Sequence, residues 1–224
     1  MANKETILIT GAGTGLGKEL ALNYASLGHT IILTGRREDV LHTVQNEIQS
    51  NGGKAYYFTL DITNYEELVR KVNHIVEEHD VHVLINNAGI GCFGSLNELE
   101  MEDINECITT NINGTIFMTK ALLPHLLKLQ NAKVMNIIST AGLKGKVNES
   151  VYVASKYAIR GFTESLQKEW EGSIAFKAVY MGGMATPFWD HTDHIADKTR
   201  LKDPKVIAEK IIQLDKEDTL EIVL

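Results

Sequence analysis

Tyr152 and Lys156 are the pair of side chains in this sequence that could together move a proton. They are four residues apart in a segment, from about 150 to 170, whose pattern predicts a helix, so both project from one face. A free phenol has a pKa of about 10, and a nearby ammonium stabilises the phenolate, which favours acid–base chemistry near neutral pH. The spacing alone is weak, because tyrosine and lysine are common on half-exposed helices.

A glycine-rich turn near the N-terminus could bind phosphate. After an apolar segment that ends at Thr10, the sequence reads G-A-G-T-G-L-G from Gly11 to Gly17. A chain that binds a dinucleotide must turn tightly here, admit a pyrophosphate to its backbone and aim helix N–H groups at it. The spacing is T-G-x-x-x-G-x-G, since Leu16 stands where G-x-G-x-x-G would need glycine. The alternative is a helix that merely follows a flexible turn, but four glycines are costly in conformational entropy for that role alone.

Further polar residues end two later strand-like segments. The sequence N-N-A-G occupies residues 86–89, and Ser139 ends the segment after it. In open α/β sheets, ligands bind outside the carboxyl ends of the strands. We therefore expect these residues to lie near the glycine turn and the Tyr152 pair.

The elements that must position these residues alternate along the chain. Short β-branched runs are separated by longer helical periodicities, which indicates βαβ units. Residues such as Ile7, Leu8 and Ile9 are consecutively apolar, as expected for strands that helices cover on both faces. The sequence predicts an α/β fold, a Rossmann-like doubly wound parallel sheet in one domain over residues 1–224. The seven predicted strands are 6–10, 30–34, 54–60, 81–86, 133–139, 174–180 and 219–224.

Composition excludes several classes of protein. The 224 residues are 44% hydrophobic and carry a net charge of −7, which disfavours nucleic acid as a partner. The longest stretch without a charged residue, 81–97, is interrupted by asparagine and glycine and is a poor membrane span. The N-terminus lacks the pattern of a secretory signal, and Cys92 and Cys107 form no disulfide or metal spacing, so we expect a cytoplasmic location.

In order and spacing together, these motifs resemble the short-chain dehydrogenase/reductase family over nearly the whole chain. The resemblance implies an oxidoreductase in which a nicotinamide cofactor exchanges a hydride with a small carbonyl or alcohol substrate. Tyr152 would supply the proton, Ser139 would bind the same oxygen, and Lys156 would hold the nicotinamide ribose and lower the pKa of the phenol. Asn111 would bend its helix and anchor a proton-relay water.

The resemblance also implies a set of cofactor contacts and no metal. Asp61 and Ile62 would contact the adenine, and Thr186 the carboxamide. The full set of implied cofactor-binding residues is Gly11, Thr14, Gly15, Leu16, Gly17, Arg36, Asp61, Ile62, Asn87, Ala88, Gly89, Tyr152, Lys156 and Thr186.

The residues after the second strand bear on the choice of cofactor. An acidic residue there would bind the ribose 2′-hydroxyl of NAD, but this chain has Gly35 followed by Arg36 and Arg37. A guanidinium matches a 2′-phosphate, so we predict NADP rather than NAD. The alternative is that both arginines only begin a surface helix beside Glu38. Thr14 stands where many NADP-preferring members of the family place a second basic residue.

The segment after the sixth strand departs from the family pattern. It reads Met181-Gly182-Gly183 where Pro-Gly is usual, and the predicted substrate loop, about 182–203, is shorter than usual. Its His and Asp residues could suggest zinc, but no third ligand is fixed by secondary structure, so we predict none. An apolar substrate site of unknown size is indicated by side chains in three loops. They are Phe93, Leu143, Val147, Met184, Phe188 and Trp189.

Two further expectations concern assembly and an alternative function. Apolar residues on the helices that carry Asn111 and Tyr152 exceed what one sheet face can cover, which predicts a homodimer, with a tetramer as the alternative. They are Ile104, Ile116, Phe117, Leu122, Phe162 and Leu166. The alternative function is a non-catalytic NADP-binding redox sensor or interaction module.

Overall fold

A parallel sheet of seven strands forms the centre of the computed structural model, which describes residues 4–224. The strand order is β3-β2-β1-β4-β5-β6-β7, and every pairing is parallel. The strands are β1 Thr6–Thr10, β2 Thr30–Gly35, β3 Lys54–Thr59, β4 Val81–Asn86, β5 Ala132–Ile137, β6 Ile174–Tyr180 and β7 Glu221–Val223. This confirms the predicted doubly wound α/β fold.

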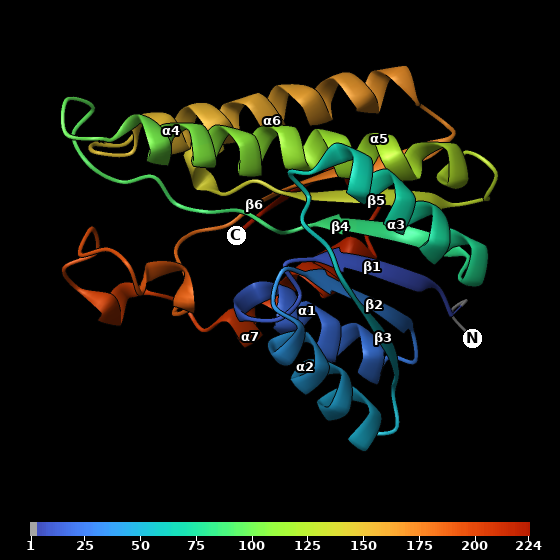
Figure 1. Cartoon of the computed structure of the whole chain (residues 1–224). Coiled ribbons are helices and arrows are strands. Elements are labelled where there is room, and N and C mark those ends of the chain that lie inside the picture. Colours follow the sequence, from blue (N-terminus) through green and yellow to red (C-terminus); the bar gives the residue numbers. More distant parts are fainter. Residues whose placement is uncertain (1–3) are drawn as a thin grey trace.

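Helices cover both faces of the sheet. Figure 1 shows α3, α4, α5 and α6 on one face and α1, α2 and α7 on the other. The helices are α1 Gly15–Ser26, α2 Glu38–Ser50, α3 Tyr65–Glu78, α4 Met101–Ile108, α5 Thr115–Leu126, α6 Ser150–Glu169 and α7 Pro204–Asp215. Among the described residues, no helix is both long and apolar enough to cross a bilayer.

The consecutive apolar residues of β1 serve two cores. Ile7 and Ile9 pack among residues of α1, α2 and α7, whereas Leu8 packs with residues of α3 and α5 on the opposite face. Because β1 lies between β2 and β4, the chain order reverses beside it, and the crevice at that reversal is the usual ligand site of such a sheet. The candidate site residues follow the carboxyl ends of these strands.

Some expectations about helix faces were wrong. Leu122 and Leu166 were expected to need a partner subunit, yet both are buried within the chain against the sheet. The homodimer therefore stays a prediction that depends on side chains that are only partly buried.

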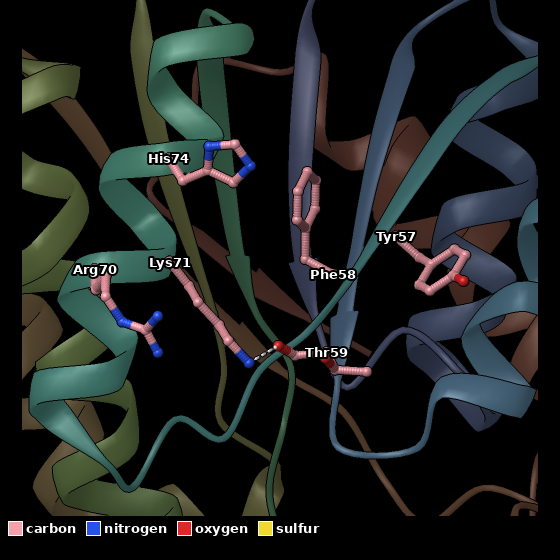
Figure 2. Close-up of a pocket in the computed structure, with 6 residues that line it drawn as sticks. All are labelled: Tyr57, Phe58, Thr59, Arg70, Lys71 and His74. Carbon is pink, nitrogen blue, oxygen red and sulfur yellow. Dashed lines mark hydrogen bonds between the residues drawn. The ribbon is translucent and has the colours of Figure 1, made fainter.

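The edge strand β3 is closed off by side chains rather than by another strand. Gln45 and Gln49 donate to the Ala55 carbonyl, and the Lys71 ammonium donates to the Thr59 carbonyl at 2.5 Å (Figure 2). Capped carbonyls make an edge a poor template for strand addition. A cavity of about 500 Å³ lies beside this edge. None of the predicted site residues lines it.

A buried charge cluster holds the end of α7 against the sheet. Asp215 accepts from Lys133 of β5 at 2.5 Å and from the Tyr24 hydroxyl at 3.0 Å, and its other oxygen lies 3.3 Å from the Lys177 ammonium of β6. Burial would raise the pKa of the Asp215 carboxyl, but the two ammonium groups outweigh it and hold that pKa below its usual range.

Candidate active site

Hydrogen bonds between β1 and β4 assemble the first part of the site. The Thr10 hydroxyl accepts from the backbone N–H groups of Asn87 and Ala88, each at 3.0 Å. The Asn87 amide in turn donates to the carbonyls of Thr10, at 2.9 Å, and Gly11, at 3.2 Å. The N-N-A-G segment therefore fixes the glycine turn, which lies beside it.

The glycine turn leaves the start of α1 open to an anion. Gly11 and Gly15 have φ of +65° and +54°, a region that strongly favours glycine. Thr14 caps α1 without a side-chain hydrogen bond, and the first turn has no acidic residue. Backbone N–H groups at the positive end of a helix dipole suit a pyrophosphate, so this turn fits the cofactor that the fold implies.

Gly17 is needed for close packing inside the turn. A Cβ added there would lie 2.3 Å from the Gly11 carbonyl oxygen and 2.5 Å from the Asn87 amide nitrogen. We expect Gly17→Ala to displace this backbone, at a cost of about 1–3 kcal/mol, and so to weaken NADPH binding about tenfold or more. Fluorescence titration of the folded variant measures this.

Gly161→Ala is the matched control for that variant, because a Cβ at this helical position meets nothing within 4 Å. It should leave cofactor affinity unchanged and should not destabilise the helix. Equal affinities for the parent and Gly17→Ala would contradict the close packing described for the turn.

Asn111 lies where one helix continues into the next. It is buried in a π-helical segment, Thr109–Gly114, that joins α4 to α5. Its side chain accepts from the Ile90 N–H at 2.8 Å and donates to the Ile90 carbonyl at 2.9 Å. It also donates to the Ser155 hydroxyl at 3.1 Å, which in turn donates to the Tyr152 carbonyl at 2.7 Å. Asn111 thus connects the loop after β4 to the helix that carries Tyr152.

Ser139 has an unusual backbone. It lies two residues beyond β5, although the sequence predicted it as the last residue of that strand. Its φ is +97°, which costs a residue with a side chain on the order of 1–3 kcal/mol. Its buried hydroxyl accepts from the Ala141 N–H at 3.2 Å. Such strain is concentrated at functional sites, where it sets the direction of a side chain.

Tyr152 and Lys156 are both buried on α6. The Lys156 ammonium donates to the Ile137 carbonyl at 3.1 Å and lies 5.6 Å from the centre of the Tyr152 ring. Burial raises the pKa of the Tyr152 phenol well above its ordinary value, which the Ser139 hydroxyl opposes. Burial lowers the pKa of Lys156 to about 8. The expected lowering of the phenol pKa by Lys156 is therefore opposed by burial in this arrangement.

Aromatic side chains cover Tyr152. The ring of Phe93, from the loop after β4, lies 5.4 Å from it, and the ring of Phe188 lies 6.0 Å from it. Trp189 stacks on Phe93 at 5.1 Å, so three of the residues predicted to line the substrate site do gather here. Leu143 and Val147 are exposed side chains, so their place in the substrate site stays a prediction.

Other residues predicted to contact the cofactor follow β2 and β3 or lie beside the glycine turn. Arg36 follows β2 with 64% of its side chain exposed, and its guanidinium is 4.0 Å from the Glu106 carboxylate. Burial would raise the pKa of the Asp61 carboxyl, but hydrogen bonds from Thr63 and the charge of Arg36 hold it below its usual range. Thr186 lies against the glycine turn, since a Cβ on Gly15 would be 3.1 Å from its methyl group.

Two other residues that the sequence singled out pack or form hydrogen bonds inside the fold. Ile62 is buried in the core on the α3 side, and the Asn86 amide donates to Thr119 and to Asn136. Within residues 4–224, no group of three His, Cys, Asp or Glu side chains is placed to hold a metal ion. His194 is one of the loop histidines that could suggest zinc. In the structure its imidazole stacks on the Phe93 ring at 4.6 Å and contacts the Glu149 carboxylate. No local sequence signal indicated Glu149.

Comparisons with known proteins identify relatives along the whole chain. The profile of the family described as short chain dehydrogenase matches residues 5–195. Sepiapterin reductase of Chlorobaculum tepidum is 30% identical over 219 residues, covering 94% of this chain and 89% of its own length. The 3-oxoacyl-acyl-carrier-protein reductase of Thermotoga maritima is 31% identical, with 86% of this chain and 78% of the relative covered.

Solved structures of similar proteins indicate the same family as these sequence relatives. An alcohol dehydrogenase from Thermococcus sibiricus, complexed with 5-hydroxy-NADP, superimposes with a TM-score of 0.91 at 28% identity and covers 99% of this chain and 96% of its own. The actinorhodin polyketide ketoreductase with NADPH gives 0.89 at 29% identity, covering 100% and 97%. From its sequence profile, its relatives and the geometry of its sheet, the chain belongs to the short-chain dehydrogenase family of oxidoreductases.

Proposed function

We propose that this protein is an NADP-dependent oxidoreductase that interconverts a ketone or aldehyde with an alcohol, with Tyr152 as general acid and base. The observation that carries the proposal is the meeting of Tyr152, Lys156 and Ser139 beside the N-N-A-G segment, at the edge where the strands end. Relatives whose names state reduction of a carbonyl group support the same chemistry.

The cofactor would lie along the glycine turn, with the open N–H groups of α1 against its pyrophosphate. When bound, it supplies or accepts the hydride. Asp61 and Ile62 would contact the adenine, Asn87, Ala88 and Gly89 would contact the cofactor after β4, and Thr186 would contact the carboxamide. Lys156 would bind the nicotinamide ribose with its ammonium, which lies 3.7 Å from where a Cβ on Gly89 would be.

The proton chemistry belongs to the chain's own residues. Burial keeps the phenol of Tyr152 protonated, which suits it to give a proton to the substrate oxygen as negative charge develops there. Ser139 donates a hydrogen bond to the same oxygen, and fixed donors in a dry site stabilise that charge far better than water does. Asn111 anchors a water that returns a proton through Lys156, whose pKa of about 8 suits proton exchange near neutral pH.

A panel of ketones and aldehydes tests this function. Each compound is incubated with the parent protein and with NADPH or NADH, and consumption of the reduced cofactor is followed. Turnover of at least one compound supports an oxidoreductase. Tight binding of NADPH with no turnover across a broad panel would favour a non-catalytic redox sensor instead.

Cofactor preference tests the assignment of Arg36. A 2′-phosphate needs a charged hydrogen-bonding partner, and Gly35 offers no carboxylate that would bind the ribose of NAD. We expect NADPH to bind roughly 10–100-fold more tightly than NADH, because one charge-assisted hydrogen bond contributes about 1.5–3 kcal/mol. Part of this preference should fade with added salt, since Arg36 is largely exposed.

The double variant Gly35→Asp, Arg36→Ala should abolish or reverse that preference. Arg37→Ala serves as its control, because Arg37 is the neighbouring exposed arginine. Fluorescence titrations with both reduced cofactors measure the ratio. Equal affinities in the parent, or an unchanged ratio in the double variant, would show that Arg36 is only a solvated residue at the start of α2.

A further inference from the structure

Residues 183–202, here called the covering loop, are joined at their base by backbone hydrogen bonds. Met184 pairs with Lys202 in an isolated parallel bridge, with hydrogen bonds of 2.9 Å from Ala185 to the Lys202 carbonyl and 3.1 Å from Lys202 to the Gly183 carbonyl. Beyond this base the loop makes two short 3₁₀ turns and projects from the sheet (orange in Figure 1).

One polar contact fixes the far part of the loop to the rest of the molecule. The imidazole Nε2 of His194 lies 3.0 Å from a carboxylate oxygen of Glu149. Across the part of the chain that the structure describes, no other hydrogen bond or ion pair joins residues 186–201 to a residue outside the covering loop. The position of the loop over the site therefore depends on this contact and on aromatic packing.

His194 contacts two side chains, Glu149 and Phe93, and each lies in a segment with further contacts of its own. Glu149 is buried, its carbonyl accepts from the Val153 N–H at 2.7 Å at the start of α6, and its second carboxylate oxygen is 3.6 Å from the Lys146 ammonium. The imidazole also lies parallel to the Phe93 ring, at 4.6 Å and 6°. Phe93 is followed by Gly94, whose N–H donates to the Asn148 carbonyl at 2.8 Å. His194 thus closes the loop onto rigid neighbours.

The same contacts reach the candidate catalytic tyrosine. Phe93 contacts both His194 and Tyr152, and it also contacts Phe188 and Trp189 of the covering loop. Glu149 is three residues before Tyr152 on the chain. If the loop moved away, Phe188 and Trp189 would leave with it, so that Tyr152 would keep Phe93 but lose Phe188 from its aromatic cover.

We propose that Glu149 and His194 form a latch that holds the covering loop closed over Tyr152, which makes them positioning residues for the site. This inference rests on the proposed function only for its catalytic consequence, since closure of the loop is a property of the protein itself. In the closed state the aromatic rings exclude water from the place where the proton is transferred, so the latch acts on the complex that reacts.

Trp189 is a reporter of the closed state. The chain has two tryptophans, and the other, Trp170, has a buried indole N–H with no hydrogen-bond partner in the described structure. Trp170→Phe therefore removes no hydrogen bond and leaves Trp189 as the single tryptophan, which is excited selectively over the tyrosines. Quenching of its fluorescence by acrylamide, in the full-length protein without substrate, measures how far the loop opens.

Two substitutions of His194 separate its two contacts. In the Trp170→Phe background, His194→Phe keeps an aromatic ring beside Phe93 but loses the hydrogen bond to Glu149, whereas His194→Gln keeps a donor and loses the ring. Glu149→Gln removes the charge of the partner. His191→Phe is the matched control, because His191 is an exposed histidine in the same loop.

We expect His194→Phe and Glu149→Gln to raise the quenching constant of Trp189 at least about twofold, the response of an indole that leaves a packed ring cluster for water. The His191→Phe control and the parent should agree. The double variant His194→Phe, Glu149→Gln should open the loop no further than either single change, because the two residues form one contact. Unchanged quenching in both single variants would overturn the latch.

Activity gives a second and separable readout. On a substrate found in the panel, the latch variants should lower kcat/KM about tenfold, the factor that 1.4 kcal/mol represents, through a lower kcat as well as a higher KM. His194→Gln, which retains the donor, should recover part of this loss. An unchanged kcat/KM with increased quenching would overturn the positioning role. If no compound is turned over, the quenching result still decides the latch, while the proposed function fails separately.

Discussion

Tyr152→Phe is expected to lower turnover by about 10²–10⁴-fold while the protein remains folded and binds NADPH as the parent does. The substitution removes only the hydroxyl, whose interaction within the chain is with the Ser139 side chain of the same site. The loss comes from the proton that the phenol would give to the substrate oxygen. Initial rates on the best panel substrate, with cofactor titration and circular dichroism on the same sample, measure it.

Tyr157→Phe is the control for that experiment. Tyr157 lies on the same helix, one residue beyond Lys156, and is 42% exposed. Loss of its hydroxyl should leave turnover within about twofold of the parent. If Tyr152→Phe reduced the substrate at the parent rate, another group would have to be the acid, and the mechanism proposed here would fail.

Asp215→Ala is expected to lower the free energy of unfolding by about 3–5 kcal/mol, the cost of leaving a buried charge without its partner. The carboxylate lies between the ammonium groups of Lys133 and Lys177, and both lysine side chains are largely buried. Urea denaturation of the parent and the variant measures the difference. Glu164→Gln is the control, since the exposed Arg160–Glu164 pair contributes at most about 1 kcal/mol.

The pH dependence of stability gives an independent check on Asp215. Its folded pKa lies below the ordinary value of 3.8, so its contribution is fully present above that value and is lost as the pH falls through the folded pKa. The difference between parent and variant should therefore be constant near neutral pH and shrink under acid conditions. A difference that grew as the pH fell would contradict the assignment.

Local sequence patterns predicted most of the sheet. The bounds of β1, β4 and β6 match their predictions, because each is a short apolar run that ends in a polar or glycine-rich turn. Bounds were less accurate where no such stop exists, as at β5, which ends at Ile137 although the apolar run continues to Ile138. There the chain turns because Ser139 adopts a positive φ, and no local pattern encodes that.

The sequence by itself determined which residue types could do chemistry and at which strand ends they would lie. Glycines at fixed positions and a tyrosine four residues before a lysine are local features, so the sequence alone is enough to identify them. Only the tertiary structure decided that burial, rather than Lys156, dominates the pKa of Tyr152. It also brought His194 to Glu149, 45 residues away. Desolvation and contacts between distant residues depend on how the elements pack together, which no local spacing specifies.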